Sequence, residues 1–326
     1  MKNKLLLLIV FIQLAVIIFL GQKIYKKTKN IQGAFSINPI LKETLDFNPT
    51  DNLKYFYEPK PNVTVINEFP EALVKYRRSN SDGLYDIVDH DVDKKDGVYR
   101  IIALGDSFTM GAFIEAKDSW PYLLAKELNN KLTCGNIKSF EIINLAVGGY
   151  DIQYAVERFK RKGVKYNPDI VIWFLKNDDF SLINEYYLPR EEDLLQKLGV
   201  KKNSLEYFYN DKGPYPGAGL TMQSLHQELG IEKISEYQNK AIYEIRDYYK
   251  NKLVIFTFPF MDTQYKSIIK EFASSNLNSY FYSNLINIYN YDGTYLSDRH
   301  PTPKGYSLIA QNLFSYLTKE KIIACD

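Results

Sequence analysis

Residues 100–111 read RIIALGDSFTMG, and this stretch decides the fold. It begins as a short apolar run of the kind that forms a buried strand, and Gly105 ends that run. Similar apolar runs recur along the chain, at 141–147, 169–175 and 252–258, with a weaker one at 279–285. The run at 169–175, DIVIWFL, is apolar on both faces, which is typical of a central strand covered on each side. The pattern therefore predicts five strands.

Helical patterns separate these strands. Pro121 begins one helix, because proline suits the first helical turn, and a second is expected from about 151 to 162. A third closes the chain, where Thr302 caps the helix and Pro303 begins it. Strands that alternate with helices pair in parallel through right-handed crossovers. We therefore expect a three-layer α/β/α domain over residues 98–326.

The composition of the chain is that of an ordinary globular protein. Of its 326 residues, 45% are hydrophobic and 25% are charged, which excludes a fibrous or largely disordered protein. The length suits about two folding units, or one large α/β domain with additions. Lys and Arg total 41 against 39 Asp and Glu, so no basic field indicates a nucleic-acid-binding protein. Cys134 and Cys325 are too few and too far apart for a disulfide scaffold or a zinc site. One bridge between them is the alternative, but we expect two free thiols.

The segment at 5–20, LLLLIVFIQLAVIIFL, indicates a membrane anchor. As a helix it is roughly 24 Å long, or about 31 Å if it continues to Tyr25, which reaches across the hydrocarbon core of a bilayer. A cleaved signal peptide is the alternative, but no A-x-A-like site follows the apolar run. We therefore expect an uncleaved transmembrane anchor, with its flanks, at residues 1–29.

The orientation of this anchor has two interpretations. A positive-inside count places its C-terminal side in the cytoplasm, because four lysines follow the run at 23–29 and only Lys2 and Lys4 precede it. A short tail before a single N-terminal span is, however, the usual layout of a signal anchor whose following domain is exported. We expect export, which makes the chain a single-pass protein of the cell membrane with its folded domain outside the cytoplasm.

Two segments flank or interrupt the predicted sheet. Residues 30–97 are expected to form a stalk or lead-in of extended segments and turns, because prolines recur and no long helical period is present. Within it, DHDVDKKDG at 89–97 lacks the glycine and glutamate of a calcium loop and is interpreted as a solvated turn. The second segment, about 181–230, is a polar and aromatic insertion that we expect to be loop-rich. It is either a lid or specificity element or a surface decoration.

Polar and reactive side chains follow the predicted strands. Because ligands bind outside the carboxyl ends of the strands in an open parallel sheet, we expect these side chains to meet at one edge. They are Asp106 and Ser107 after the first strand, Asn144, Gly148 and Gly149 at the second, Lys176, Asn177 and Asp178 after the third, and Asp298, Arg299 and His300 in the last loop. The other two histidines, His90 and His226, do not neighbour a strand end.

This set suits acyl transfer through a serine. Serine is a weak nucleophile until an imidazole takes its proton, and a carboxylate holds that imidazole in the required tautomer. We therefore predict Ser107 as the nucleophile, His300 as the base and Asp298 as the orienting acid. The oxyanion of the tetrahedral intermediate needs fixed donors. We expect them from the Ser107 and Gly149 N–H groups and from the Asn177 side-chain amide.

The four blocks together resemble the SGNH, or GDSL-type, hydrolase superfamily. The blocks are GDSFTMG at 105–111, NLAVGG at 144–149, Asn177-Asp178 and Asp298-x-His300-Pro301, and they follow the superfamily's order from about Tyr99 to the end. The resemblance implies a flavodoxin-like parallel sheet, no metal or other cofactor, and hydrolysis or transfer of ester-linked acyl groups. It also implies the roles given above for Ser107, Gly149, Asn177 and His300. The serine lacks the Gly-x-Ser-x-Gly setting of the α/β-hydrolase fold.

Two positions depart from the superfamily's usual pattern. Leu175 stands where the third block usually has glycine, and it is expected to narrow or reshape the pocket. The acid usually lies three residues before the histidine, where this chain has Ser297, so Asp298 lies one residue closer and Asp292 is the alternative acid. Asp106 is expected to brace the turn that carries the nucleophile through hydrogen bonds.

The anchor and the serine site together lead to one main hypothesis. It is a membrane-anchored serine esterase that removes acyl groups, acetyl foremost, from an envelope glycan or another exported substrate. An O-acyltransferase on the same scaffold is one alternative, because the acyl-enzyme step is shared. A catalytically silent glycan-binding or assembly subunit is the other. The expected partners are thus an ester-bearing substrate, with a polysaccharide as one candidate, and the membrane, but no nucleic acid.

Overall fold

The computed structural model describes residues 52–67, 69–86, 88–199 and 216–325, the short segments 209–210 and 213–214, and two isolated positions, 13 and 22. Apart from those two positions, the predicted anchor at 1–29 and the first part of the lead-in lie outside the described residues. Among the residues that are described, no helix has both the length and the apolar character needed to cross a membrane.

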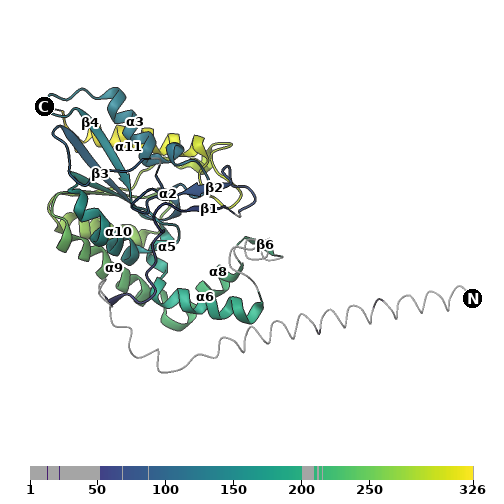
Figure 1. Cartoon of the computed structure of the whole chain (residues 1–326). Coiled ribbons are helices and arrows are strands. Elements are labelled where there is room, and N and C mark those ends of the chain that lie inside the picture. The colour runs from purple at the N-terminus through teal and green to yellow at the C-terminus, as the bar shows by residue number, and fades with distance from the viewer. Residues whose placement is uncertain are drawn as a thin grey trace, which may run out of the picture.

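A parallel sheet of five strands forms the centre of the described structure (Figure 1). Its strands, in spatial order, are β4 (Ser139–Asn144), β3 (Val98–Leu104), β5 (Ile170–Phe174), β8 (Lys252–Phe256) and β9 (Ser279–Tyr282). Each neighbouring pair is parallel. Counted along the chain this is the 2-1-3-4-5 order of flavodoxin-like sheets. The prediction of an α/β fold with a parallel sheet of five strands is confirmed.

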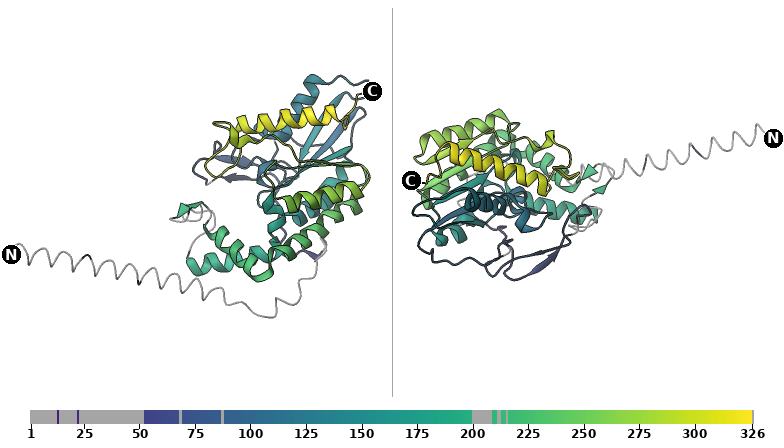
Figure 2. Two further views of the ribbon diagram at one scale, coloured as in Figure 1. Left: turned by 180° about the vertical axis from the view of Figure 1, so that it is seen from behind. Right: turned by 90° about the horizontal axis from the view of Figure 1, so that it is seen from above.

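Helices pack on both faces of the sheet (Figure 2). On one face lie α3 (Trp120–Lys131) and α11 (Pro303–Lys319), and on the other α4 (Ile152–Arg158), α9 (Ile231–Tyr248) and α10 (Thr263–Ser275). Successive strand residues point to opposite faces. Ile101 and Ala103 of β3 therefore pack beneath α3 and α11, whereas Ile102 and Leu104 pack beneath the other three helices.

The local signals for helix ends match the structure at two places. α3 begins at Trp120 with Pro121 in its first turn, and α11 begins at Pro303. The Thr302 hydroxyl accepts a hydrogen bond from the Gly305 N–H at 3.4 Å, which is the predicted cap. The helix expected over 151–162 is less regular, because α4 ends at Arg158 and the chain continues as a π-helical turn, Phe159–Gly163.

The prediction that the segment at about 181–230 is loop-rich is wrong. It contains α6 (Asn184–Leu198) and α8 (Pro216–Leu229), with the short strands β6 (Tyr209–Asn210) and β7 (Gly213–Pro214) between them. Both helices contain residues that disfavour a helix, such as Pro189 in α6. The two helices pack together, and Arg190 of α6 pairs with Glu228 of α8 at 2.9 Å. This packing, rather than local propensity, explains why the segment is helical.

The described part of the lead-in packs on the α/β domain. It contains a short antiparallel hairpin of β1 (Thr64–Ile66) and β2 (Tyr76–Arg78), and it buries Phe69 and Leu84. The buried guanidinium of Arg158 in α4 binds the Glu58 carboxylate and donates to the Gly83 carbonyl oxygen. The described residues of the lead-in therefore share a core and ion pairs with the domain.

The acidic stretch at 89–97 was expected to be a solvated turn, but His90 within it is buried. Its side chain is only 4% exposed and lies between Asp86, at 2.9 Å, and Glu141 of β4, at 2.8 Å. The buried Arg100 of β3 binds the same Glu141 carboxylate at 2.7 Å. Burial alone would lower the pKa of His90, but the hydrogen bonds to the two carboxylates outweigh it and raise the pKa to about 9.

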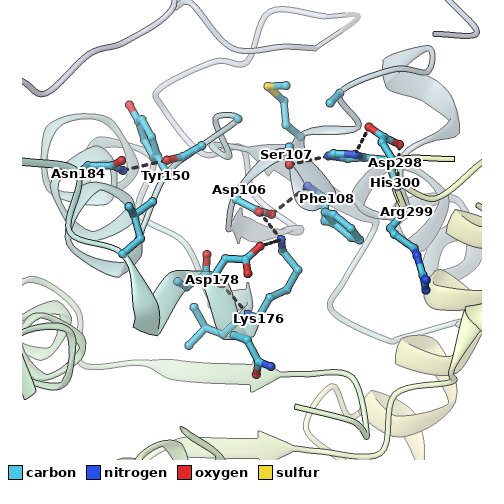
Figure 3. Close-up of a pocket in the computed structure, with 18 of the residues that line it drawn as sticks. Asp106, Ser107, Phe108, Tyr150, Lys176, Asp178, Asn184, Asp298, Arg299 and His300 are labelled. Carbon is cyan, nitrogen blue, oxygen red and sulfur yellow. Dashed lines mark hydrogen bonds and ion pairs between the residues drawn. The ribbon is translucent and has the colours of Figure 1, made fainter. Parts of the chain in front are cut away.

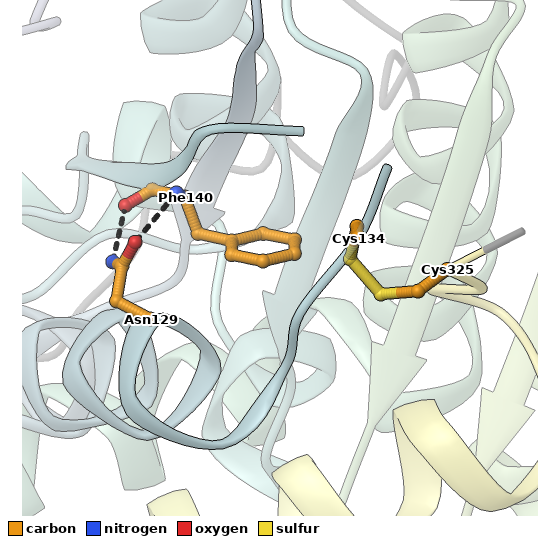
Figure 4. Close-up of a disulfide and its surroundings, with 4 residues drawn as sticks. All are labelled: Asn129, Cys134, Phe140 and Cys325. Carbon is orange, nitrogen blue, oxygen red and sulfur yellow. Dashed lines mark hydrogen bonds between the residues drawn. A yellow bond between two sulfur atoms is a disulfide. The ribbon is translucent and has the colours of Figure 1, made fainter. Parts of the chain in front are cut away.

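Cys134 and Cys325 form a disulfide (Figure 4), so the expectation of two free thiols is wrong. Their Cα atoms are 4.5 Å apart although 191 positions separate them in the sequence. α3 and α11 pack side by side, and each cysteine lies a few residues beyond the end of one of these helices. On the same side of the molecule, Asn129 of α3 hydrogen-bonds both backbone groups of Phe140, which ties this helix to β4 (Figure 4).

We predict that His90→Gln makes stability less dependent on pH. The folded-state pKa of about 9 exceeds the ordinary value of 6.5, so the ion pairs stabilise the fold fully below about pH 6.5 and are lost as the pH rises through 9. Between pH 6 and pH 9.5 the wild type should lose on the order of 2–3 kcal/mol more unfolding free energy than the variant. Urea unfolding at both pH values measures this difference, and an equal loss in the two proteins contradicts the prediction.

Candidate active site

The turn after β3 presents Ser107 at the carboxyl edge of the sheet. Gly105 has φ +145°, and a Cβ there would lie 2.4 Å from the Thr109 hydroxyl oxygen, so the turn requires glycine. Ser107 then begins the four-residue helix α2 (Ser107–Met110). Asp106 caps this helix by accepting a hydrogen bond from the Phe108 N–H at 2.9 Å. The expected bracing role of Asp106 is confirmed.

Lys176 lies directly beneath this turn (Figure 3). Its ammonium group is 2.7 Å from Asp106 Oδ2 and 4.2 Å from the centre of the Phe108 ring. Burial opposes the charged form, but Asp106, and after it Asp178 and Asp179, raise the pKa of Lys176 above its ordinary value. The ammonium therefore stays charged and balances the Asp106 carboxylate next to Ser107.

His300 reaches Ser107 from the loop before α11 (Figure 3). Its Nε2 atom is 2.8 Å from Ser107 Oγ, and its Nδ1 atom is 2.7 Å from Asp298 Oδ2. The Asp298 side chain is fully buried and also accepts from the His300 backbone N–H at 3.1 Å. With the Nδ1 proton directed at the carboxylate, Nε2 is left as the acceptor for the serine hydroxyl.

The backbone between Asp298 and His300 accounts for the contact between these two closely spaced side chains. Arg299 has φ +74°, a left-handed conformation that turns the chain so that Asp298 and His300 face each other. Ser297, the family's usual acid position, instead donates its hydroxyl and N–H to Glu71 of the lead-in. Asp292, the alternative acid, is exposed and makes no hydrogen bond to His300 among the described residues.

Aromatic rings hold the imidazole from two sides. The ring centres of Phe108 and Phe113 each lie 4.7 Å from that of His300, the second in an edge-on arrangement. Both phenylalanines are more than 90% buried. Because packed rings restrict side-chain rotation, the imidazole is held in place before any substrate binds.

Hydrogen bonds to the carbonyl oxygens of Gly148 and Gly149 hold the backbone at Gly149 in place. It has φ +81°, and its carbonyl oxygen accepts from the Asn184 side-chain amide at 2.8 Å. The Tyr57 hydroxyl donates to the Gly148 carbonyl oxygen at 2.7 Å. Within the described part of the chain, no group hydrogen-bonds to the Gly149 N–H or the Ser107 N–H. Both are therefore available to a ligand.

Asn177 begins α5 (Asn177–Ser181), and one end of its amide is already engaged. The Asp262 N–H donates to Asn177 Oδ1 at 3.0 Å, which leaves the Nδ2 group as the available donor. Leu175, where the family usually has glycine, is 1% exposed and packs in the core beneath α4 and α9 while also lining the cavity. The neighbouring carboxylates differ, since Asp178 is exposed whereas Asp179 is buried and accepts from the Lys176 N–H.

All the predicted site residues line one cavity of about 870 Å³. These residues are Ser107, Gly149, Asn177, Asp298 and His300. The lead-in supplies part of the wall through Tyr57, Ile66, Asn67 and Arg77, and α6 and α8 supply another part through Tyr187, Leu188, Glu191 and Met222. The segment at 181–230 is therefore part of the cavity wall rather than a surface decoration.

Sequence reasoning missed three residues of the site. Lys176 was named among the residues after the third strand but given no role, and its place beside Asp106 could have been suspected from a charged residue directly after an apolar central strand. Tyr57 comes from the lead-in, and no pattern in the sequence singles it out. Arg77 also comes from the lead-in, and the stretch YRRSNSDGL at 76–84 was expected to contact the edge of the domain, but no chemistry was assigned to it.

We predict that Lys176→Met lowers stability by roughly 3–5 kcal/mol, because it leaves the buried Asp106 carboxylate without its cation. The double variant Asp106→Asn/Lys176→Met, which removes both charges, should recover much of this loss. Lys197→Met removes one partner of an exposed pair with Asp193 and should change stability by less than about 1 kcal/mol. Urea unfolding compares the four proteins, and a Lys176→Met midpoint equal to the wild type contradicts the prediction.

The chain is similar to a known protein family and, at low identity, to several solved structures. The sequence profile of the family described as GDSL-like lipase/acylhydrolase matches residues 101–313. No curated protein sequence matches the chain. Similar solved structures include the psychrotrophic esterase EstA from Pseudoalteromonas sp., with 15% identity over 68% of this chain and 98% of that chain and a TM-score of 0.41.

Two further solved structures show a similar degree of likeness. An acetyl xylan esterase, AlAXEase, has 17% identity over 67% of this chain and 99% of that one, with a TM-score of 0.38. A two-domain esterase active on acetylated mannans has 15% identity over 70% of this chain and 52% of that one, with a TM-score of 0.43. These scores are low, so the assignment depends on the sequence profile, which spans all four blocks. The chain belongs to the GDSL-like lipase/acylhydrolase family and is an ester-hydrolysing enzyme.

Proposed function

We propose that the chain is a serine esterase in which Ser107 attacks the ester carbonyl, His300 acts as the base and Asp298 orients the imidazole. One observation carries this proposal: His300 Nε2 lies 2.8 Å from Ser107 Oγ while Nδ1 lies 2.7 Å from a buried carboxylate. A nucleophile, a base and an orienting acid in hydrogen-bond contact are the arrangement that activates a serine.

The reaction proceeds in two steps. Ser107 Oγ bonds to the acyl carbon while its proton passes to His300 Nε2, and the imidazolium then protonates the departing alcohol. In the second step a water molecule gives a proton to His300 Nε2 and bonds to the acyl carbon. The imidazolium then returns a proton to Ser107 Oγ as the carboxylic acid leaves. The oxyanion formed in each step accepts hydrogen bonds from the Ser107 and Gly149 N–H groups and from Asn177 Nδ2. The free state of those groups among the described residues supports this role.

We extend the proposal to a small acyl group, acetyl foremost, on a larger alcohol such as a glycan. Met110 lies beside Gly148, as Ser107 does, and Leu175 lines the cavity at the position that is usually glycine; we take these bulky side chains to favour a small acyl group. Aromatic rings also line the cavity. Among them, the Phe260 side chain is 51% exposed, and its ring centre lies 5.6 Å from that of Tyr289. Exposed rings beside polar groups suit a polar molecule with apolar faces, as a sugar is.

We also propose that the folded domain lies outside the cytoplasm, tethered by the apolar segment at 5–20. The disulfide between Cys134 and Cys325 supports this location, because such bonds persist in oxidising compartments and are rare in the cytosol.

The catalytic proposal predicts the activities of four variants of the full chain. Ser107→Ala and His300→Gln should each lower kcat for 4-nitrophenyl acetate by about a thousandfold or more, because each removes a reacting group. Asp298→Asn should lower it by at least about a hundredfold, because the imidazole loses its orienting acceptor. Asp292→Asn is the matched control and should keep wild-type activity. Undiminished hydrolysis by Ser107→Ala refutes the proposed site.

The proposed location predicts the redox state of the cysteines in cells. After acid quenching, the full chain should resist a maleimide reagent unless it is first reduced, because both thiols are joined. A variant that lacks residues 5–20 should stay in the cytoplasm and react at both cysteines. Gel mobility after labelling measures both. Free thiols in the quenched full chain contradict an oxidising location.

A further inference from the structure

Arg77 lines the active-site cavity from the lead-in hairpin. It lies on β2 opposite Val65 of β1 and follows the strand alternation, so Arg77 lines the cavity whereas the next residue, Arg78, is exposed and does not. The Arg77 guanidinium contacts the Met110 sulfur at 3.9 Å. Met110 in turn lies beside the Gly148 backbone, next to Ser107. One side chain therefore separates this cation from the nucleophile.

The guanidinium of Arg77 is half-buried yet has no carboxylate partner among the described residues. Its Nε atom is buried without a hydrogen-bond partner in that part of the chain. Its other contacts are the Met110 sulfur and the Tyr85 ring, 5.9 Å from the ring centre. Burial lowers the pKa of Arg77 from its ordinary value, and Tyr85 only partly opposes this. A guanidinium has five N–H donors, so within the described part of the chain most of the hydrogen-bonding capacity of Arg77 is unused.

The other charged side chains named here that line the cavity either have a hydrogen-bonding or ionic partner or are exposed to solvent. Lys176 is neutralised by Asp106, and the Asp298 carboxylate is used by His300. Glu191 accepts a hydrogen bond from the Tyr187 hydroxyl at 2.9 Å. Arg299 is exposed and lies over the Tyr289 ring at 5.4 Å. Among the described residues, Arg77 is thus the partly desolvated cation of this cavity that lacks a counter-charge.

We propose that Arg77 binds an anionic group, a carboxylate or a phosphate, in the alcohol portion of the ester substrate. This inference rests on the proposed function, since it places the acyl group at Ser107 and the remainder of the substrate along the cavity wall formed by the hairpin. A planar guanidinium donates two parallel hydrogen bonds to a carboxylate or phosphate, and such charge-assisted bonds are strong where water is partly excluded. The substrate is then an acylated anionic compound rather than a neutral one.

A matched pair of esters tests the proposal with the full-length protein. 4-Acetoxybenzoate carries a carboxylate on its alcohol portion, and its methyl ester is the neutral counterpart. Because the two esters differ in intrinsic reactivity, the quantity compared is the change in kcat/KM of each ester between variants. Arg77→Gln should lower kcat/KM for the anionic ester by about tenfold to a hundredfold and that for the neutral ester far less. Arg77→Lys should restore part of the loss.

Two control variants separate local charge from overall charge. Arg78→Gln removes the same charge from the outer face of the same strand and should leave both rates as they are in the wild type. Arg299→Gln should have a smaller effect than Arg77→Gln, because water screens an exposed cation. The proposal is overturned if Arg77→Gln lowers kcat/KM equally for both esters. It is also overturned if only Arg299→Gln removes the preference for the anionic ester.

Anion binding gives a readout that does not depend on hydrolysis. Calorimetry on the full-length Ser107→Ala variant measures the affinity for benzoate and for inorganic phosphate, which separates a carboxylate from a phosphate ligand. Adding the Arg77→Gln substitution to this variant should lower the affinity for the anion that binds at least tenfold. If the wild type hydrolyses neither ester, the proposed function fails, and this binding experiment still decides the inference. If Arg77→Gln changes neither the affinity for either anion nor the preference for the anionic ester, the inference about Arg77 is wrong, whereas the proposed esterase function still stands.

Discussion

The parallel order of the central sheet is the constraint on which the candidate site depends. Because all five strands run in the same direction, the turns after β3, β4 and β5 meet at one edge. These turns carry Ser107, Gly149 and Asn177. His300 is the exception, since it precedes α11 and is placed by the packing of α11 against α3 and by the two phenylalanine rings beside it. The sheet thus fixes three members of the set, and helix packing fixes the fourth.

Segments outside the sheet complete the cavity. Tyr57 holds the Gly148 carbonyl group from the lead-in, Asn184 holds that of Gly149 from α6, and Glu71 holds Ser297 beside the acid. These contacts fix loops that the strands alone would leave free to move. At the other end of the lead-in, His90 binds Glu141 of β4, and Arg100 of β3 donates to the carbonyl oxygens of Asp91 and Val92, so the lead-in is attached to the sheet there as well.

Much of the fold and of the site geometry could be predicted from local signals. Apolar runs ending in glycine or polar residues gave the strands, and Thr302 with Pro303 marked the last helix. What failed depends on contacts between distant segments. The Cys134–Cys325 bond follows from helix packing, and α6 and α8 follow from their packing against each other. Likewise, a lysine after a strand does not reveal that Asp106 lies 2.7 Å away, because that distance exists only after the sheet has formed.

The bond between Cys134 and Cys325 also divides the site in a way that the strand order does not. It closes a covalent ring that contains Gly149, Asn177, Asp298 and His300, whereas Ser107 lies on the chain before the ring begins. A single backbone cut anywhere between the two cysteines would therefore leave the proposed base, the proposed acid and the two proposed oxyanion donors on one covalently connected molecule. The two pieces of such a cut chain would stay joined until the disulfide was reduced.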